Sequence, residues 1–179
     1  MTTMPESAVL FDAAAVQAGI DAVAADLGER CQEGEWLVLC VMQGGLMFTS
    51  ELLKRLDTAL LTLDYIRVTR YRGGTTGGEL EFRAAPETPL EGRSVLVLDD
   101  IFDEGHTLAA IDHWCRENGA ANVVNAVLLD KRHDRKVSGF RPDVAGLTCE
   151  DRYVFGFGMD YEGYFRNLPE IRALGANTP

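Results

Sequence analysis

Cysteine, basic side chains and long apolar runs are all scarce in this sequence. Its four cysteines stand at positions 31, 40, 115 and 149, without a Cys-x-x-Cys pair, which argues against a zinc site and predicts small buried thiols in a reducing compartment. No apolar run has the length of a membrane span, and residues 1–5 lack the basic and apolar segments of a secretion signal. We therefore expect a cytoplasmic protein without a membrane partner.

The charge balance is strongly acidic. Asp and Glu number 28 against 17 Lys and Arg, which gives a net charge of −11 and a pI near 4.7. Nucleic-acid phosphates are bound by clustered basic side chains, so we expect no nucleic-acid partner. The length of 179 residues allows a core that buries about 70% of the unfolded surface, and we expect one domain over residues 1–179.

Short apolar runs alternate with helical patterns along the chain. The apolar runs predict strands that are buried on both faces, and apolar residues at spacings of three and four predict amphipathic helices. These elements are helices over 12–30 and 46–56, strands over 36–42, 95–98 and 123–129, and a hairpin of 61–69 with 79–83 around a glycine-rich loop. The fold class is therefore expected to be α/β.

The most informative stretch covers residues 94–108. Its strand is expected to end at Leu98, and carboxylates follow at once at Asp99, Asp100 and Asp103. Gly105 then opens a turn toward a helix that begins near Leu108. In an open α/β sheet, ligands bind at this carboxyl edge of the strands.

This turn has the chemistry of a phosphate site beside a sugar site. Backbone N–H groups of residues 103–107 and the positive end of the following helix suit a phosphate, and the Thr107 hydroxyl adds a donor. The carboxylates would repel that phosphate unless they accept hydrogen bonds from sugar hydroxyls or hold Mg²⁺. The stretch therefore predicts a phosphorylated sugar as the ligand, bound together with Mg²⁺.

Residues 95–108 resemble the phosphoribosyl-pyrophosphate (PRPP) signature of type I phosphoribosyltransferases, which is an apolar strand, two acids, two apolar residues, Asp, any residue, Gly, any residue and Thr. Residues 99–103 also fit the Asp-Asp-x-x-Asp pattern of prenyl-diphosphate synthases. Those proteins carry it on a helix of a much longer all-helical chain, so we set this alternative aside. The resemblance implies a central, mostly parallel sheet flanked by helices, a flexible hairpin loop, and a small C-terminal hood to which about residues 142–179 contribute.

The resemblance is closest to the hypoxanthine-guanine branch of that family. It implies a PRPP site formed by Asp99, Asp100, Asp103, Glu104, Gly105, His106 and Thr107, and a pyrophosphate loop formed by Gln43, Gly44 and Gly45 together with Arg166. Gln43 stands where the branch usually has lysine, so only the backbone part of that loop carries over. Arg70 and Tyr71 align with the Ser-Tyr pair of the flexible loop that closes over the site, and Arg70 departs from that pattern.

The same branch implies a purine site in the second half of the chain. Lys131 aligns with the lysine that donates to the 6-oxo group of the purine, which disfavours adenine because an ammonium cannot accept from a 6-amino group. Tyr153 aligns with the aromatic residue that stacks on the base, and the backbone of Val154 reads the base edge. Asp160 aligns with an acid that meets Mg²⁺, for which Asp99 and Asp100 are the other candidate ligands. His133, next to Lys131, is expected only to line the rim.

The implied activity is purine salvage. The 5-phosphoribosyl group passes from PRPP to hypoxanthine, guanine or both, with xanthine left open, and gives IMP or GMP and pyrophosphate. Asp103 is the candidate general base or acid at purine N7, and the family implies a homodimer or homotetramer. Two alternatives stay open: a regulatory protein that senses PRPP or nucleotides on the same fold, and a phosphoribosyltransferase for another base.

Overall fold

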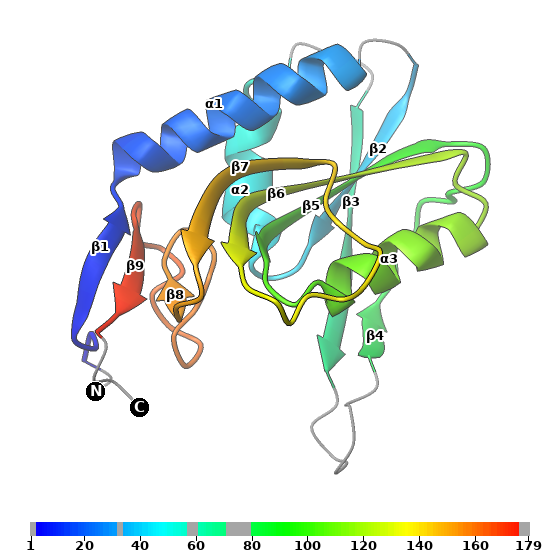
Figure 1. Cartoon of the computed structure of the whole chain (residues 1–179). Helices are drawn as coiled ribbons and strands as arrows, with labels where there is room; N and C mark the ends of the chain where they lie inside the picture. The colour runs from blue at the N-terminus through cyan, green and yellow to red at the C-terminus, as the bar shows by residue number, and fades with distance from the viewer. Residues whose placement is uncertain (1–2, 32–33, 57–60, 71–79, 176–179) are drawn as a thin grey trace.

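The computed structural model describes residues 3–31, 34–56, 61–70 and 80–175, and within them a six-stranded sheet forms the centre (Figure 1). In spatial order its strands are β4 (Leu80–Ala84), β3 (Leu61–Arg70), β2 (Trp36–Val41), β5 (Ser94–Phe102), β6 (Asn122–Arg132) and β7 (Val144–Glu150). β4 pairs antiparallel with β3, and all other neighbours are parallel. The expected α/β class with a mostly parallel sheet is confirmed.

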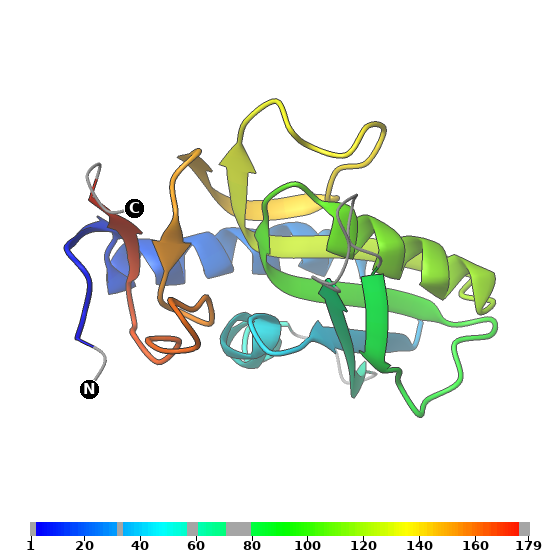
Figure 2. The ribbon, with the colours of Figure 1, turned by 90° about the horizontal axis from the view of Figure 1, so that it is seen from below.

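Helices cover both faces of this sheet (Figures 1 and 2). α1 (Ala13–Arg30) and α2 (Gly45–Leu53) pack on one face, and α3 (His106–Glu117) packs on the other. The six residues of β2 are all buried, because alternate side chains point toward the two layers: Val38 joins the α1 and α2 side, whereas Leu37 and Leu39 join the α3 side. This two-sided burial explains why the central strands are continuous apolar runs.

A second, antiparallel sheet lies beside the first and contains β1 (Ser7–Phe11), β9 (Ile171–Leu174) and β8 (Val154–Phe155). We call this sheet, with the segment 156–170 that links β8 to β9, the hood. The expected boundary at about residue 142 needs correction, because β7 pairs with β6 in the main sheet and β1 supplies a hood strand. The Arg172 guanidinium ties β9 to β1 by donating to the Ser7 hydroxyl at 3.1 Å and the Ser7 carbonyl at 3.2 Å.

Two strands run further than the sequence indicated. β5 does not end at Leu98, because its ladder with β6 continues through Asp99 opposite Val127 and Phe102 opposite Asp130. β6 extends in the same way to Arg132. The predicted hairpin is present as the antiparallel pair β3 and β4, while its connecting loop lies outside the described residues. Among the helices described, none is both long and apolar enough to cross a membrane.

Candidate active site

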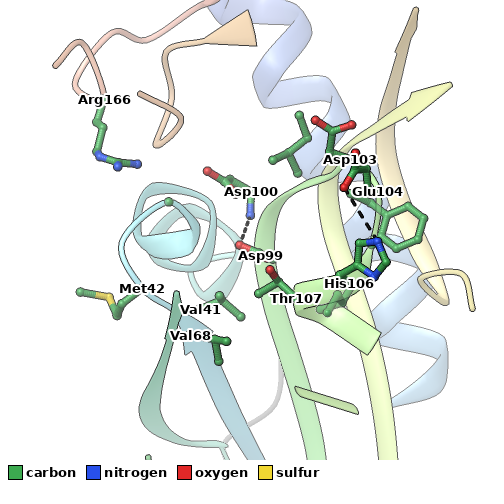
Figure 3. A pocket seen from close by; sticks show the side chains of 15 residues that line it. Val41, Met42, Val68, Asp99, Asp100, Asp103, Glu104, His106, Thr107 and Arg166 are labelled. Carbon is green, nitrogen blue, oxygen red and sulfur yellow. Dashed lines mark hydrogen bonds and ion pairs between the residues drawn. The ribbon is translucent and has the colours of Figure 1, made fainter. Parts of the chain in front are cut away.

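A polar cavity of about 450 Å³ lies at the carboxyl ends of β2 and β5, as predicted for an open α/β sheet (Figure 3). It brings together residues that are far apart in the chain: Val41, Met42, Gly44, Val68, Asp99, Asp100, Asp103, Glu104, Gly105, His106, Thr107 and Arg166 all line it. Every residue expected to bind PRPP is in this set. Gln43 and Gly45 are not, and Gly45 is instead the first residue of α2.

The turn between β5 and α3 has the form expected of a phosphate site. Gly105 adopts a φ of 87°, a left-handed conformation that suits glycine, and α3 begins at His106. The first N–H groups of a helix have no intrahelical partner, so those at the start of α3 are available to an anion in the cavity. The Glu104 carboxylate lies 3.8 Å from the His106 ring and is drawn beside it in Figure 3.

Asp99 and Asp100 are adjacent, buried carboxylates in the wall of this cavity. Burial, and then the charge of Asp100, raises the pKa of Asp99 well above its ordinary value. Burial also raises the pKa of Asp100, although the charge of Arg166 offsets part of that effect. Two buried carboxylates with this repulsion favour a cation or hydroxyl donors beside them. Because carboxylate oxygens are ligands that Mg²⁺ prefers, these two residues fit a Mg²⁺ ion.

Arg166 connects the hood to this cavity. Its guanidinium donates to the Gly158 carbonyl and to the Asp160 carboxylate, both at 2.6 Å, and Figure 3 shows it across the cavity from Asp100. The second Asp160 oxygen accepts from the Gly163 N–H at 2.7 Å. Arg166 therefore presents a positive charge to the cavity, while Asp160 is held in a fixed orientation.

A second, smaller cavity of about 200 Å³ adjoins the first. Its lining is Asp100, Ile101, Asp103, Lys131, Tyr153, Val154, Met159 and Asp160, so it contains all four residues expected to bind the purine. The Tyr153 side chain is half exposed, and its hydroxyl donates to the Asp160 carbonyl at 3.2 Å. Its ring meets the Tyr161 ring edge-on at 5.9 Å between centroids, which fixes one aromatic face at this cavity.

Asp103 lines both cavities and stands where they meet. One of its carboxylate oxygens accepts from the Lys131 ammonium at 2.7 Å, and the other lies 2.7 Å from His133 Nε2. Burial alone would raise the pKa of Asp103, but the hydrogen bonds from Lys131 and His133 outweigh it and lower the pKa. A carboxylate that is ionised at neutral pH, and open to both cavities, can accept a proton there.

His133 is the functional candidate that the sequence reasoning missed. It was expected to line the rim, whereas its side chain is only 4% exposed and contacts Asp103. A signal existed, because Lys131 lies next to the last residue of β6 and His133 follows two positions later. Residues i and i+2 of an extended chain face the same side, so Lys131 and His133 were candidates for one shared partner.

Two further predicted segments are the flexible loop with Arg70 and Tyr71 and the pyrophosphate loop that begins at Gln43. Arg70 is the last residue of β3, but its side chain and the whole of Tyr71 lie outside the part of the chain that the structure describes. In the pyrophosphate loop, the Met42–Gln43 peptide bond is cis, and Gly44 precedes α2 against the Asp100 carboxylate.

One additional group of possible metal ligands lies on the far side of Asp103. Ligand atoms of Asp103, His133 and Asp151 are all within 4.8 Å of one another. Both carboxylates in this group already have cationic partners, since Lys131 contacts Asp103 at 2.7 Å and Arg135 contacts Asp151 at 2.6 Å. These ion pairs supply the positive charge that a metal would otherwise provide, so the buried carboxylates of Asp99 and Asp100 remain the better oxygen ligands.

The fold and the two adjoining cavities define a phosphoribosyltransferase, and the family model of the phosphoribosyl transferase domain matches residues 8–162. A hypoxanthine-guanine phosphoribosyltransferase from Lactococcus lactis is 40% identical over 77% of this chain and 74% of its own. A hypoxanthine-guanine-xanthine phosphoribosyltransferase from Tritrichomonas foetus is 34% identical over 93% of this chain and 90% of its own. The crystal structure of a hypoxanthine phosphoribosyltransferase from Staphylococcus aureus superposes with a TM-score of 0.87 at 30% identity, covering 94% of this chain and 91% of that one.

The chain belongs to the hypoxanthine-guanine phosphoribosyltransferase family.

Proposed function

We propose that the protein is a purine-salvage enzyme that transfers the 5-phosphoribosyl group of PRPP to a 6-oxopurine, hypoxanthine or guanine. The observation that carries this proposal is the position of Asp103 between a phosphate cavity and a smaller aromatic-walled cavity. Reactants bound in the two cavities would be held next to each other with a carboxylate between them, which is the positional catalysis such a transfer needs.

On the PRPP side, residues 103–107 would hold the 5′-phosphate at the start of α3. Asp99 and Asp100 would hold the ribose hydroxyls, either by accepting hydrogen bonds from them directly or by ligating a metal ion to which the hydroxyls also bind, and Gly44 and Arg166 would meet the pyrophosphate. We assign the metal as Mg²⁺, with Asp160, Asp99 and Asp100 as its candidate ligands. When bound, it would neutralise charge on the departing pyrophosphate.

On the base side, the Lys131 ammonium would donate to the purine 6-oxo group. Tyr153 would stack on the ring, and the backbone of Val154 would contact the base edge. All three residues line the smaller cavity. The Asp103–Lys131 contact uses one of three ammonium protons, so Lys131 can bridge the carboxylate and the base.

The chemistry follows from this placement. Purine N9 forms a bond with C1′ of the ribose, and the bond between C1′ and the pyrophosphate oxygen breaks, with its electron pair leaving on pyrophosphate. The proton on purine N7 passes to Asp103, whose lowered pKa keeps it ionised and ready to accept. Positive charge develops at C1′ in the transition state, where the surrounding carboxylates stabilise it.

We further propose that residues 1–179 act as one cytoplasmic domain that assembles into a homodimer or homotetramer. An apolar groove of about 690 Å³ between α2 and β3 supports assembly, because the exposed side chains of Leu46 and Tyr65 line it together with Leu63. Size-exclusion chromatography with light scattering tests this part of the proposal.

The activity is tested by incubating the purified protein with PRPP, Mg²⁺ and, separately, hypoxanthine, guanine, xanthine and adenine. We expect nucleotide and pyrophosphate from the 6-oxopurines and none from adenine. If PRPP binds but no base is converted, the enzymatic proposal is wrong and a PRPP-sensing role takes its place. Conversion of adenine alone would contradict the role of Lys131.

A further inference from the structure

We propose that His133 is a positioning residue that holds the Asp103 carboxylate in its catalytic orientation through a neutral Nε2–H donor. This inference deepens the proposed function and rests on it. Lys131 and His133 approach different oxygens of the same carboxylate, each at 2.7 Å, so Asp103 is fixed from two sides.

The hydrogen-bond pattern around the ring determines its tautomer. The backbone N–H of Arg135 donates to His133 Nδ1 at 3.1 Å, so Nδ1 is the acceptor of the neutral imidazole. The proton of the neutral ring then belongs to Nε2, which is the atom that faces Asp103. His133 is therefore a hydrogen-bond donor to the carboxylate in its uncharged form.

His133 and Lys131 differ in what else they face. Lys131 lines the base cavity, so the purine competes with Asp103 for its ammonium protons. His133 does not line either cavity of the active site; it borders a separate cavity with Arg132, Asp134 and Lys136 on the other side of the carboxylate. When the base engages Lys131, the hydrogen bond from His133 remains to orient Asp103.

The backbone after β6 holds this ring in place. The Val137 N–H donates to the Glu104 carbonyl at 2.8 Å, which joins the loop to the turn that carries Asp103. Lys136 forms an ion pair with Asp130, and its ammonium lies 4.4 Å from the centre of the Phe102 ring. His133 is thus anchored to the same β5–α3 junction whose carboxylate it contacts.

The hydrogen bond should also influence the protonation of Asp103. Lys131 faces it from β6, and His133 and Arg135 face it from the loop that follows β6. Cys149 lies on β7, Asp151 follows that strand, and Glu104 is the neighbour of Asp103 in the turn. A donor to the charged form favours ionisation, so loss of His133 should raise the pKa of Asp103. The acid limb of the kcat pH profile would then move toward neutral pH.

The test compares His133→Leu, which removes the donor, with His133→Gln, whose amide N–H can take the place of Nε2–H. We expect His133→Leu to lower kcat for hypoxanthine by on the order of tenfold, part of the full general-base effect, with the KM for PRPP nearly unchanged and the acid limb shifted upward. His133→Gln should retain most of the kcat, and the acid limb of its kcat pH profile should stay at the pH of the unmodified protein. His113→Leu serves as the control, because His113 is exposed on α3 and pairs only with Glu117 in the described structure.

Three results would overturn the proposal: unchanged kcat and pH profile in His133→Leu, equal losses in the Leu and Gln variants, or losses that follow only a lower melting temperature. A measurement independent of turnover separates this proposal from the proposed function. The Asp103 carboxyl pKa can be followed by ¹³C NMR, assigned with Asp103→Asn. The pKa of Asp103 should rise in His133→Leu and remain unchanged in His133→Gln, even if the unmodified protein converts no base.

Discussion

Gly158 of the hood and Gly44 before α2 meet backbone to backbone, and neither position has room for a side chain. A Cβ atom on Gly158 would lie 2.1 Å from the Gly44 carbonyl oxygen, and one on Gly44 would lie 1.9 Å from a carboxylate oxygen of Asp100. The hood, the pyrophosphate loop and the PRPP acids are therefore stacked in direct contact. The packing of the hood against the active site therefore requires glycine, without a Cβ atom, at both Gly44 and Gly158.

Gly158→Ala should separate the hood from α2 and destabilise the protein. Its φ of 99° already disfavours a side chain, and the contact with the Gly44 carbonyl adds to this, so we expect a loss of about 2–3 kcal/mol in the free energy of unfolding. The KM for PRPP should rise because Arg166 donates to the Gly158 carbonyl. Urea unfolding and initial-rate kinetics measure the two effects.

Gly163→Ala is a matched control for that variant. Gly163 also has a positive φ, 85°, but a Cβ there would meet no atom within 4 Å. It should lose only about 1 kcal/mol and keep its KM for PRPP. Equal effects of the two substitutions would show that backbone strain alone, and not the contact with Gly44, is responsible.

Asp103→Asn should lower kcat by about 10²–10⁴-fold, since an amide cannot accept the N7 proton. The affinity for PRPP should change little, because the phosphate is expected to contact backbone N–H groups of the turn. Single-turnover kinetics and a PRPP binding titration separate the two quantities. Asp26→Asn, on the exposed side of α1, is the control, and normal turnover in Asp103→Asn would remove the general-base role.

Lys131→Gln should reduce kcat/KM for 6-oxopurines, by on the order of tenfold to a hundredfold, because the charged donor to the 6-oxo group is lost. Any activity with adenine should not fall. Competition kinetics with hypoxanthine, guanine and adenine measure the selectivity, with Lys54→Gln on the exposed surface as the control. A uniform loss across all bases would mean that Lys131 acts only through Asp103.

Asp99→Asn should stabilise the ligand-free protein at pH 7 while it weakens ribose binding. The raised pKa of Asp99 means that its charged form opposes folding above that pKa, and that the penalty disappears below the unfolded value of about 3.9. Removal of the charge should add about 1 kcal/mol at pH 7, and the gain should vanish near pH 4. Thermal unfolding at both pH values tests this, and a gain that is equal at both would contradict it.

The cysteines should be nearly unreactive in the folded protein. All four are buried, and burial raises the pKa of Cys31 to about 11 and that of Cys115 to about 12. Few thiolates therefore exist at pH 8. Titration with a thiol reagent should label all four thiols in guanidinium chloride and almost none without it, whereas fast labelling of the native protein would indicate opening of the core.

The central sheet and the PRPP turn were predictable from local sequence, because buried strands and the Gly105 turn leave clear patterns. The end of β5 was not. Asp99 and Asp100 are poor strand residues by propensity, yet the parallel ladder with β6 continues through them. These two carboxylates are buried at the proposed ligand site. At functional sites, the secondary structure expected from residue propensity often differs from the observed structure.

The hood was only partly predictable, for a different reason. β1 and β9 are short, with five and four residues, and they pair across most of the chain, with Ser7 opposite Leu174. No local pattern contains information on such a distant partner. For His133 the local spacing indicated a partner shared with Lys131, but it could not identify Asp103, which follows a different strand and adjoins His133 only in the folded sheet.

The pairing of β9 with both β1 and β8 has a consequence for synthesis on the ribosome. Val154 lies opposite Ala173, so the strand that carries the base-binding wall gains its neighbour only after residue 173 has left the exit tunnel. The PRPP turn belongs to a sheet whose strands are complete by Glu150. A nascent chain can therefore acquire a binding site for the sugar phosphate before it acquires one for the purine.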